Sequence, residues 1–578
     1  MNMASFLLAA YRRSVFFSIF AFFAFLAPSL ALAQDFSGDG PFEISTEAEL
    51  RAFATAVNGG NDFSGKTVKL TADIELTSAW TPIGVYSSNN ANNKPFQGIF
   101  DGNGKVLDNV SVTSTDDGIG LFGTIGANGV VKDLGVINSS ITNTATNSWY
   151  SGGLVGYNTG TIENSYFKGS VKASDGGRIG GLAGYNLGTI SDSYSEGTVE
   201  GNRDQIGGLA GGNLGGTISG SYSKGTVRAI GTSSDGTGGL VGFNTSSSST
   251  SILGSIINSF STSAVSGISN TGGLVGDNNP GKISGSFSTG DVTATGTGTR
   301  IGGLVGRSNT NSTIDNSYST GNVSKTGTDN GTTTAGTGGF VGRSNAPITN
   351  SYSTGSVDAT TASTYLGAFV GSAGGASTVG NSYYDKDAND KTATNGGVGK
   401  STAEMKIQGT FSTWDFDDIW GIDNRINDGY PHLLWSAKAL CESGGYVHGE
   451  DGFCKTAAEM AAEEEAARRA ACEAEEGNVW ENGECKEPDE EPCTGNECEP
   501  SNIRLSQIAD SQINIRTTAN AIMLSNLPQN AKVEAYNLQG KLVYSAGFSR
   551  AGSATIPVRT KGVYVIKTGT EIFRVAVK

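Results

Sequence analysis

The chain has 578 residues, of which 85 are Gly, 55 are Asp or Glu and 39 are Lys or Arg, and its net charge at neutral pH is −16. It contains only two His and six Cys, which leaves almost no material for a Ser/His/Asp or Cys/His triad or for a His-rich metal centre. Abundant Gly with a charged fraction of 16% indicates an all-β or repetitive chain. No basic stripe with interleaved aromatic residues is present, which argues against nucleic acid as a partner.

The first 33 residues have the pattern of an export signal. Arg12 and Arg13 precede an apolar stretch at 15–26, and small residues mark a cleavage site between Ala33 and Gln34. The apolar stretch is too short for a comfortable membrane span. The sequence therefore predicts an exported protein, located at the cell surface or outside the cell.

Residues 34–150 are expected to form an N-terminal cap and lead-in coils. Thr46 and Glu49 have the spacing of a capping box, and apolar residues follow at helical spacing over 50–57. A short amphipathic helix at this point would cover the open end of a stack of strands and block pairing between edges.

A repeat dominates residues 151–400. Copies of Gly-Gly-Leu-Val/Ala-Gly or close variants start at Gly152, Gly180, Gly207, Gly238, Gly272, Gly302, Gly338 and Gly367. Each unit has three short apolar runs separated by turn residues, which favours strands. Five buried apolar side chains contribute roughly 1.5–3 kcal/mol each, whereas ordering each residue costs roughly 1–2 kcal/mol. One unit alone is therefore unstable, and the units must stack.

The predicted architecture is all-β, a parallel β-solenoid of about eight coils. Gly pairs would allow close backbone approach, and the repeated Leu and aromatic residues would form internal ladders. The repeated aromatic residues are Tyr166, Tyr194, Tyr222, Phe260, Phe287, Tyr318, Tyr352 and Tyr383. A β-propeller is the alternative, which is disfavoured because the units are short for four-stranded blades. Segments 244–252 and 325–337 are expected to form outer loops.

The string GGLVGYNTGTIENSYFKGSV at 152–171 and its recurrences closely resemble the GLUG motif of bacterial surface and secreted proteins. The resemblance covers about residues 150–385. Residues 42–76 and 411–434 are similar to the opening and closing segments of such arrays. The resemblance implies extracellular repeats with adhesion or accessory roles and no defined activity.

Residues 401–436 are expected to form the C-terminal cap of the solenoid. Ser401 and Glu404 predict a short capped helix. The residues expected to seal the last coil are Trp414, Trp420, Tyr430 and Pro431.

Residues 437–500 form an acidic linker that contains all six Cys. A spacing of 13 predicts disulfides Cys441–Cys454 and Cys472–Cys485, each around a small hairpin, and Cys493–Cys498 is the third expected pair. A helical spacer is predicted over 457–476. Zinc is the alternative for these Cys, and it is disfavoured because CxxC spacing is absent.

Residues 501–578 alternate apolar and polar side chains with turn residues between the runs, which predicts a small antiparallel β-sandwich. The strings VEAYNLQGKLVY (533–544), KGVYVIK (561–567) and FRVAVK (573–578) strongly resemble the C-terminal sorting domain of type IX secretion substrates. That resemblance implies that outer-membrane secretion machinery recognises the tail. An ordinary Ig-like accessory domain is the alternative.

Candidate sites are few, and no catalytic or cofactor-binding residue is predicted. Asp385, Asp387 and Asn389 alternate oxygen ligands like the start of a calcium loop, but the later Gly and Glu of such a loop are missing. Calcium therefore competes with a simple polar turn.

Two further groups of charged residues are candidate sites. The acidic cluster at 415–418 offers paired carboxylates between two Trp, as a glycosidase or a carbohydrate platform would need, but a turn in the cap is favoured. Arg307 and Arg343 hold equivalent repeat positions and are expected to stack, without an evident acidic partner.

The sequence as a whole predicts a non-enzymatic surface protein that adheres or binds polysaccharide or another cell-surface ligand. A polysaccharide-degrading β-helix enzyme and a passive stalk are the alternatives. Exposed aromatic stripes would favour glycan binding.

Overall fold

The structure is a computed structural model that describes residues 35–577 with gaps at 90–91, 232–234, 296, 328–334, 360–364, 392–394, 444–446, 449–453, 474–478, 482–483, 487–513, 519–520, 528–530, 538–541, 549–551, 558–561 and 569–570. The predicted export signal with its cleavage site, and the Cys493–Cys498 pair, lie outside the described residues. The chain divides into two compact units, residues 1–464 and 465–578.

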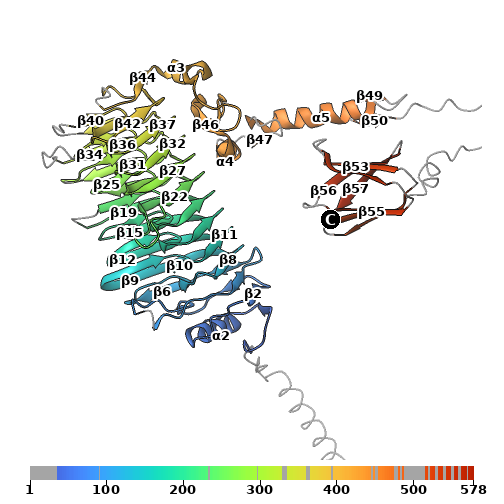
Figure 1. The fold of residues 1–578 in the computed structure, drawn as a ribbon, viewed down its shortest axis with the longest axis horizontal. Coiled ribbons are helices and arrows are strands. Elements are labelled where there is room, and N and C mark those ends of the chain that lie inside the picture. Colours follow the sequence, from blue (N-terminus) through green and yellow to red (C-terminus); the bar gives the residue numbers. More distant parts are fainter. Residues whose placement is uncertain are drawn as a thin grey trace, which may run out of the picture. The chain divides into compact units, whose positions relative to one another are not determined.

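The first unit is a parallel β-solenoid with three faces (Figure 1). On the first face the described strands follow the order β1 (Phe42–Ile44), β2 (Thr67–Leu70), β4 (Ile99–Asp101), β8 (Val130–Lys132), β11 (Thr161–Glu163), β14 (Thr189–Ser191), β18 (Thr217–Ser219), β22 (Gly254–Ile257), β27 (Gly281–Ser284), β32 (Thr313–Asp315), β37 (Pro347–Thr349) and β42 (Thr378–Gly380).

The second face contains, in order, β7 (Phe122–Ile125), β10 (Val155–Asn158), β13 (Ala183–Asn186), β17 (Ala210–Leu214), β21 (Val241–Thr245), β26 (Val275–Asn278), β31 (Val305–Ser308), β36 (Val341–Ser344) and β41 (Val370–Ala373). Successive coils pair in parallel, so the strand after each Gly-Gly lies beside its counterpart in the next coil. The predicted solenoid is confirmed, and the propeller alternative is wrong.

The third face has the longest strands, and the loop expected at 244–252 lies instead between β21 of the second face and β22 of the first. Its described strands are β3 (Ile74–Glu75), β5 (Val106–Asp108), β6 (Ser111–Ser114), β9 (Gly135–Gly152), β12 (Tyr166–Gly180), β15 (Tyr194–Gly201), β16 (Ile206–Gly207), β19 (Tyr222–Ala229), β20 (Asp235–Gly238), β23 (Phe260–Ser261), β24 (Ala264–Gly267), β25 (Ser269–Gly272), β28 (Phe287–Ser288), β29 (Val292–Thr295), β30 (Ile301–Gly302), β33 (Tyr318–Ser319), β34 (Val323–Thr326), β35 (Thr337–Gly338), β38 (Tyr352–Ser353), β39 (Val357–Ala359), β40 (Leu366–Gly367), β43 (Tyr383–Asp385) and β44 (Val398–Lys400).

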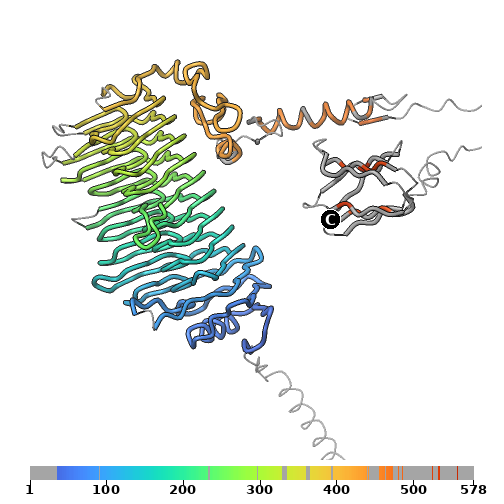
Figure 2. Tube along the Cα trace, viewed as in Figure 1, coloured from blue at the N-terminus to red at the C-terminus, as the bar shows by residue number. Residues whose placement is uncertain are grey.

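The coils stack closely along the whole solenoid (Figure 2). A Cβ on Gly152 would lie 2.1 Å from the carbonyl oxygen of Val155, and one on Gly153 would lie 2.3 Å from that of Gly181. Real Cβ atoms do not approach backbone so closely, so the Gly pair is required by the spacing of the coils, as predicted.

Identical interior side chains form ladders between coils. Ile162, Ile190 and Ile218 are paired in register and fully buried. A buried amide ladder accompanies them: the Asn158 amide donates to Asn186 at 2.8 Å, and the Asn186 amide donates to Asn213 at 2.8 Å. The buried polar groups of these side chains are therefore satisfied by the repeat itself.

The repeated aromatic residues form the predicted stack, but its predicted internal position is wrong. Centroids of consecutive rings from Tyr166 to Tyr352 lie 4.6–5.1 Å apart with nearly parallel planes. The following Ser points inward instead; the hydroxyl of Ser223, for example, donates to the Gly239 carbonyl oxygen at 2.6 Å. Because side chains alternate along a strand, the rings lie on the outer surface of the third face. We call this stack the outer ladder.

Helix α2 (Glu47–Asn58) covers the N-terminal end of the solenoid (Figure 1). The predicted capping box is present: Glu49 N donates to the Thr46 hydroxyl at 3.3 Å, and Thr46 N donates to the Glu49 carboxylate at 3.1 Å. The apolar residues of 50–57 that were expected to face the core are buried.

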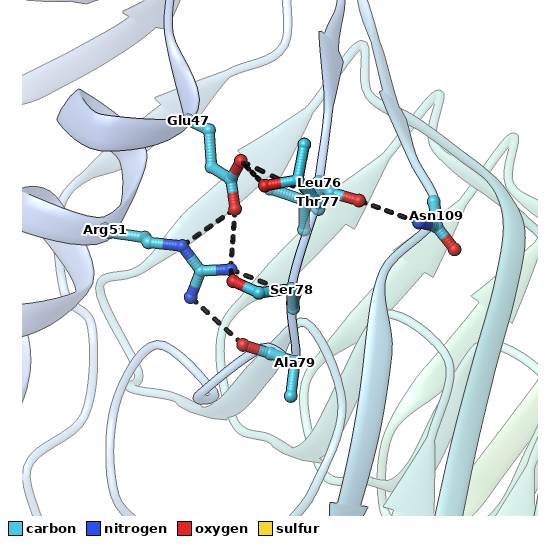
Figure 3. Close-up of polar contacts among 7 residues, drawn as sticks. All are labelled: Glu47, Arg51, Leu76, Thr77, Ser78, Ala79 and Asn109. Carbon is cyan, nitrogen blue, oxygen red and sulfur yellow. Dashed lines mark hydrogen bonds and ion pairs between the residues drawn. The ribbon is translucent and has the colours of Figure 1, made fainter.

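The first turns of α2 are fastened to the lead-in segment (Figure 3). The Glu47 carboxylate accepts hydrogen bonds from Arg51 Nη2 at 2.7 Å and from the Thr77 hydroxyl at 2.8 Å. Arg51 also donates to the carbonyl oxygens of Ser78 at 2.9 Å and Ala79 at 3.0 Å. The bond from Thr77 is the main cause that lowers the pKa of Glu47. These contacts fix the segment that leads into the site described below.

Residues 401–436, which we call the strap, contain α3 (Thr402–Met405), η2 (Gln408–Phe411), β45 (Trp420–Gly421), η3 (Asn427–Gly429), β46 (His432–Leu433) and η4 (Leu434–Ser436). The predicted capping box of Ser401 and Glu404 is present.

The strap lies along several coils instead of sealing only the last one. Trp420 packs on Tyr318 and Tyr352, and Trp435 packs on Phe260 and Phe287 of the outer ladder. The Tyr352 hydroxyl donates to the Pro431 carbonyl oxygen at 2.5 Å. The C-terminal part of the ladder is thereby buried, while Tyr166, Tyr194 and Tyr222 stay partly exposed.

The remaining elements of the chain follow the predicted linker and tail. The linker contains α4 (Ala437–Ser443), β47 (Val447–His448), β48 (Cys454–Lys455), α5 (Ala457–Glu473), β49 (Val479–Glu481) and β50 (Glu484–Lys486). The tail contains β51 (Asn514–Thr518), β52 (Ala521–Leu527), β53 (Ala531–Asn537), β54 (Leu542–Phe548), β55 (Gly552–Pro557), β56 (Gly562–Thr568) and β57 (Glu571–Val577), which form two antiparallel sheets. The small C-terminal antiparallel β-sandwich is thus confirmed. Its buried residues include Ile522, Val533 and Ile566.

Candidate functional site

A group of aromatic side chains gathers at the corner where the third face leads back to the second. The corner residues of three successive coils are Tyr150, Arg178 and Gln205, with φ of 68°, 60° and 65°. The next three coils have Gly236, Asn270 and Arg300 there, all with positive φ. Gly and Asn adopt a positive φ with little strain, whereas Arg does not. A larger side chain costs roughly 1–2 kcal/mol at such a position, and residues held in strained backbone are found preferentially at functional sites.

Four tyrosine rings pack around this corner. The Tyr86 ring lies 4.9 Å from that of Tyr150 and 4.8 Å from that of Tyr157, and the Tyr150 ring stacks on Tyr185 at 5.2 Å. Tyr157 and Tyr185 occupy the same register position of β10 and β13. The four rings come from the lead-in segment and three strands, so stacking of the coils is what assembles them.

Arg178, one of the three corner residues, contacts several of these rings. Its guanidinium carbon lies 4.4 Å from the Tyr185 ring centroid and 4.9 Å from that of Trp149, distances at which cation–π attraction operates. It donates hydrogen bonds to the Tyr150 hydroxyl at 3.0 Å and to Gln205 Oε1 at 2.8 Å. Trp149 remains 37% exposed, so this indole offers surface to a ligand. We call these seven residues, namely Tyr86, Trp149, Tyr150, Tyr157, Arg178, Tyr185 and Gln205, the corner cluster.

A cleft of about 360 Å³ opens beside the corner cluster. Its lining residues are Asn58, Thr81, Pro82, Gly84, Val85, Tyr86, Ser87, Ser88, Asp116, Asp117, Gly118 and Ile119. Asp117 connects the cleft to the cluster, because its Oδ1 accepts a hydrogen bond from Trp149 N at 2.7 Å.

The last residue of α2 holds the wall of the cleft. The Asn58 amide donates to the Pro82 carbonyl oxygen at 2.9 Å, and its Oδ1 accepts from Gly84 N at 2.8 Å. The helix that caps the solenoid therefore positions one side of the cleft, and the first coils position the other.

Three phenol groups of the cluster, those of Tyr86, Tyr157 and Tyr185, have raised pKa values. Burial, together with a hydrogen bond to Tyr150, raises the pKa of Tyr86 well above its usual value. Burial also raises the pKa of Tyr157, and it raises that of Tyr185 to about 12. At neutral pH these hydroxyls are hydrogen-bond donors and acceptors rather than charges.

The arrangement suits a ligand with one apolar face and many hydroxyl groups. Ligand sites combine aromatic surface with a few placed polar groups, and an exposed indole beside carboxylate, amide and hydroxyl groups supplies both. Sugar rings have this character, since their C–H faces are apolar and their edges carry hydroxyls.

The calcium candidate is part of a folded turn. Asp385 is buried, and its carboxylate accepts hydrogen bonds from the Thr402 hydroxyl at 2.7 Å and the Tyr430 hydroxyl at 2.6 Å. Asp387 accepts from Thr402 N at 3.0 Å, and Asn389 donates to the Gly355 carbonyl oxygen at 3.3 Å. Within the described part of the chain, no group of three His, Cys, Asp or Glu is placed to hold a metal ion. Calcium binding stays an untested prediction.

The acidic cluster of the strap forms a local turn. Asp415 Oδ1 accepts hydrogen bonds from the backbone N–H groups of Asp417 at 3.0 Å and Asp418 at 2.9 Å. All three side chains are exposed. The favoured interpretation as a turn in the cap agrees with these bonds.

The predicted pair of arginines stacks, but the absence of an acidic partner was wrong. Arg307 and Arg343 are register partners of β31 and β36. Arg307 also forms a two-pronged ion pair with Asp277, its register partner one coil earlier. The acidic partner lies thirty residues away in sequence, and only the in-register stacking of coils brings it into contact.

The corner cluster was not predicted from the sequence. A signal existed, since the residue after Gly-Gly-Leu-Val/Ala-Gly is Tyr157 and Tyr185 in the first two repeats and changes afterwards to Gly212, Phe243, Asp277, Arg307, Arg343 and Ser372. Tyr86 gave no such signal, because it lies in the irregular lead-in segment.

The predicted disulfide between Cys472 and Cys485 is confirmed. Cys441 is also disulfide-bonded, and the side chain of its expected partner Cys454 lies outside the described part.

Comparison with known proteins identifies repeats of one kind. The GLUG motif matches residues 147–172, 175–200, 203–228 and 297–324. The first two of these segments contain all of the corner cluster except Tyr86 and Gln205. In the part of the chain that the structure describes, no helix has the length and apolar character needed to span a membrane.

Two relatives and one solved structure show similarity. Halomucin of Haloquadratum walsbyi is 31% identical over 141 residues, which is 24% of this chain and 2% of halomucin. A protein of Evansella cellulosilytica described as a Gly-rich membrane protein is 33% identical over 160 residues, which is 27% of this chain and 14% of that protein. A Bacteroides ovatus structure described as an immunoglobulin A1 protease is 19% identical, with 68% of this chain and 93% of that chain covered, and its TM-score of 0.29 carries no argument.

Proposed function

We propose that the protein is an exported surface or secreted β-solenoid that binds polysaccharide without cleaving it. The single observation that carries this proposal is the corner cluster beside the cleft, where a partly exposed indole and four tyrosine rings meet hydroxyl, amide and carboxylate groups.

A repetitive rod suits display of such a site. Each coil contacts its neighbours, so the solenoid is an extended and stiff support. The GLUG repeats and the similarity to a protein described as a membrane protein support a location at the surface.

The C-terminal sandwich is proposed to direct export through type IX-like outer-membrane machinery. The support is the resemblance of residues 533–544, 561–567 and 573–578 to the sorting domains of that route. Removal of residues 501–578 would then leave the protein inside the cell envelope, and export of the truncated chain would contradict this role.

The binding proposal is tested by incubating the mature full chain with a panel of insoluble polysaccharides. Retention on at least one of them without release of reducing or unsaturated sugar is the expected result. Release of product would show an enzyme, and loss of both retention and product would leave a stalk or a protein ligand.

A further inference from the structure

The cleft beside the corner cluster has a definite electrostatic character. Its lining contains two carboxylates, Asp116 and Asp117, and no Lys or Arg among the lining residues that the structure describes. The ammonium group of Lys94 lies close by, but it is directed to the Asn58 carbonyl oxygen at 2.7 Å. A negatively charged ligand in the cleft would therefore meet two like charges.

The nearby guanidinium does not reverse this character. Arg178 is placed over the rings of Trp149 and Tyr185 and donates to the Tyr150 hydroxyl and to Gln205. The bonds from Nε and Nη1 and the ring contacts hold the guanidinium against the cluster. Its charge acts on the aromatic side of the site, while the two carboxylates line the cleft itself.

We infer that the site takes a neutral, hydroxyl-rich polysaccharide and rejects uronate-rich or sulfated chains. This inference rests on the proposed function and names the class of its ligand. Hydroxyl groups donate strong hydrogen bonds to carboxylates, whereas an anionic ligand pays for like-charge contact. The Asp117 carboxylate has acceptor sites beyond the one that binds Trp149 N. It is therefore able to accept a hydrogen bond from a ligand and still hold the backbone N–H of Trp149.

The aromatic side fits the same class. Arg178 lies against one side of the Trp149 ring, and a Cβ on Gly177 would meet that ring at 2.6 Å, so the neighbouring coil already covers part of the indole. The exposed remainder is apolar indole surface on the residue whose backbone N–H donates to Asp117 Oδ1. A sugar ring stacked on it would place its hydroxyls toward the carboxylates.

The test measures binding of the full mature chain to soluble probes by affinity electrophoresis or calorimetry. The neutral probes are a β-glucan and a galactomannan, and the anionic probes are alginate, polygalacturonate and heparin. We expect at least one neutral probe to bind about tenfold more tightly than every anionic probe at low salt.

The informative variant is the double substitution D116N/D117N, which keeps the shape of the cleft and one acceptor oxygen on each of the two side chains. It is expected to reduce the discrimination against anionic probes severalfold. The matched control is Asp192→Asn, an exposed carboxylate at another corner of the coil that already adopts a positive φ suited to Asn, and it should leave the discrimination unchanged.

The outcomes separate the two proposals. Equal or tighter binding of an anionic probe by the unmodified protein would overturn the neutral class while leaving polysaccharide binding intact. Unchanged discrimination in D116N/D117N would also overturn it. If none of the soluble probes binds and the insoluble panel retains nothing, the proposed function itself fails.

Discussion

The molecule carries two groups of stacked aromatic rings on its outside, and they differ in almost every physical respect. The outer ladder repeats one position of the sequence in register, with nearly parallel rings 4.6–5.1 Å apart. The corner cluster draws its rings from different positions, at tilted angles and partly at positive φ. The ladder repeats along most of the array, whereas the cluster is confined to the first coils, where Tyr86 of the lead-in segment joins residues of the first repeats.

The two groups also differ in what covers them. The strap buries the C-terminal part of the ladder, and Lys168 lies over the Tyr166 and Tyr194 rings at 5.6 Å. The cluster instead adjoins an open cleft. The ladder is thus largely covered by other parts of the chain, whereas the cluster lies beside open space.

The largest expected effect is on stability, from Trp420→Ala in the strap. Trp420 is fully buried, with its ring 4.4 Å from Trp414. Truncation should lower the free energy of unfolding by about 3–5 kcal/mol, measured by denaturant titration. Trp435→Ala, at a residue that is 37% exposed, should cost less. If Trp420→Ala weakened polysaccharide binding as much as a substitution in the corner cluster does, the two aromatic groups would not differ in function.

An intermediate effect is expected from Gly118→Ala beside the cleft. The new methyl group would lie 2.4 Å from Tyr86 Cβ, at a residue with a φ of 66°. Displacement of Tyr86 should weaken polysaccharide binding about tenfold or more, while backbone strain costs about 1–2 kcal/mol of stability.

Gly104→Ala is the control for this substitution. Gly104 has a φ of 71°, and a Cβ there meets nothing within 4 Å. The backbone strain is thus matched without the clash. Equal binding by the two variants would show that Tyr86 has no part in the site.

The smallest expected effect is on the pH dependence of stability. Burial raises the pKa of Tyr185 to about 12, against about 10 in the unfolded chain. The Tyr185 phenol therefore stays protonated to a higher pH in the folded state than in the unfolded chain. The stability that this difference contributes is complete below pH about 10 and is lost as the pH rises toward 12. Unfolding titrations should show a steeper decline above pH 10 in the unmodified protein than in Tyr185→Phe. Parallel declines would contradict the burial of this phenol.

The sequence allowed prediction of the features that repeat. Gly pairs at near-constant spacing predicted the stacked coils, and the capping boxes at Thr46 and Ser401 predicted the helices α2 and α3. The position predicted for the outer ladder was wrong, because Tyr and Phe were expected inside the solenoid on account of their aromatic character. Side chains alternate along a strand, so Ser223 and its equivalents point inward and the rings point outward. The in-register partner of Arg307 was also missed, since pairs between coils are local in space and distant in sequence.

The candidate site was predictable only in part. Tyr157 and Tyr185 share a motif position, so a column of aromatic residues was open to inference. The addition of Tyr86 and the cleft walls from Asn58 and Asp117 depends on how the irregular lead-in segment folds against α2. That packing has no periodicity from which to infer it.

The central claim is that the corner cluster, and not the outer ladder, binds polysaccharide. The most direct measurement compares Trp149→Ala with Tyr194→Ala by calorimetry on the polysaccharide that the unmodified chain retains. Trp149→Ala should weaken binding at least about tenfold, in the manner of an aromatic hot spot, and Tyr194→Ala should bind like the unmodified chain. Loss of binding in Tyr194→Ala with normal binding in Trp149→Ala would contradict the account and transfer the site to the ladder.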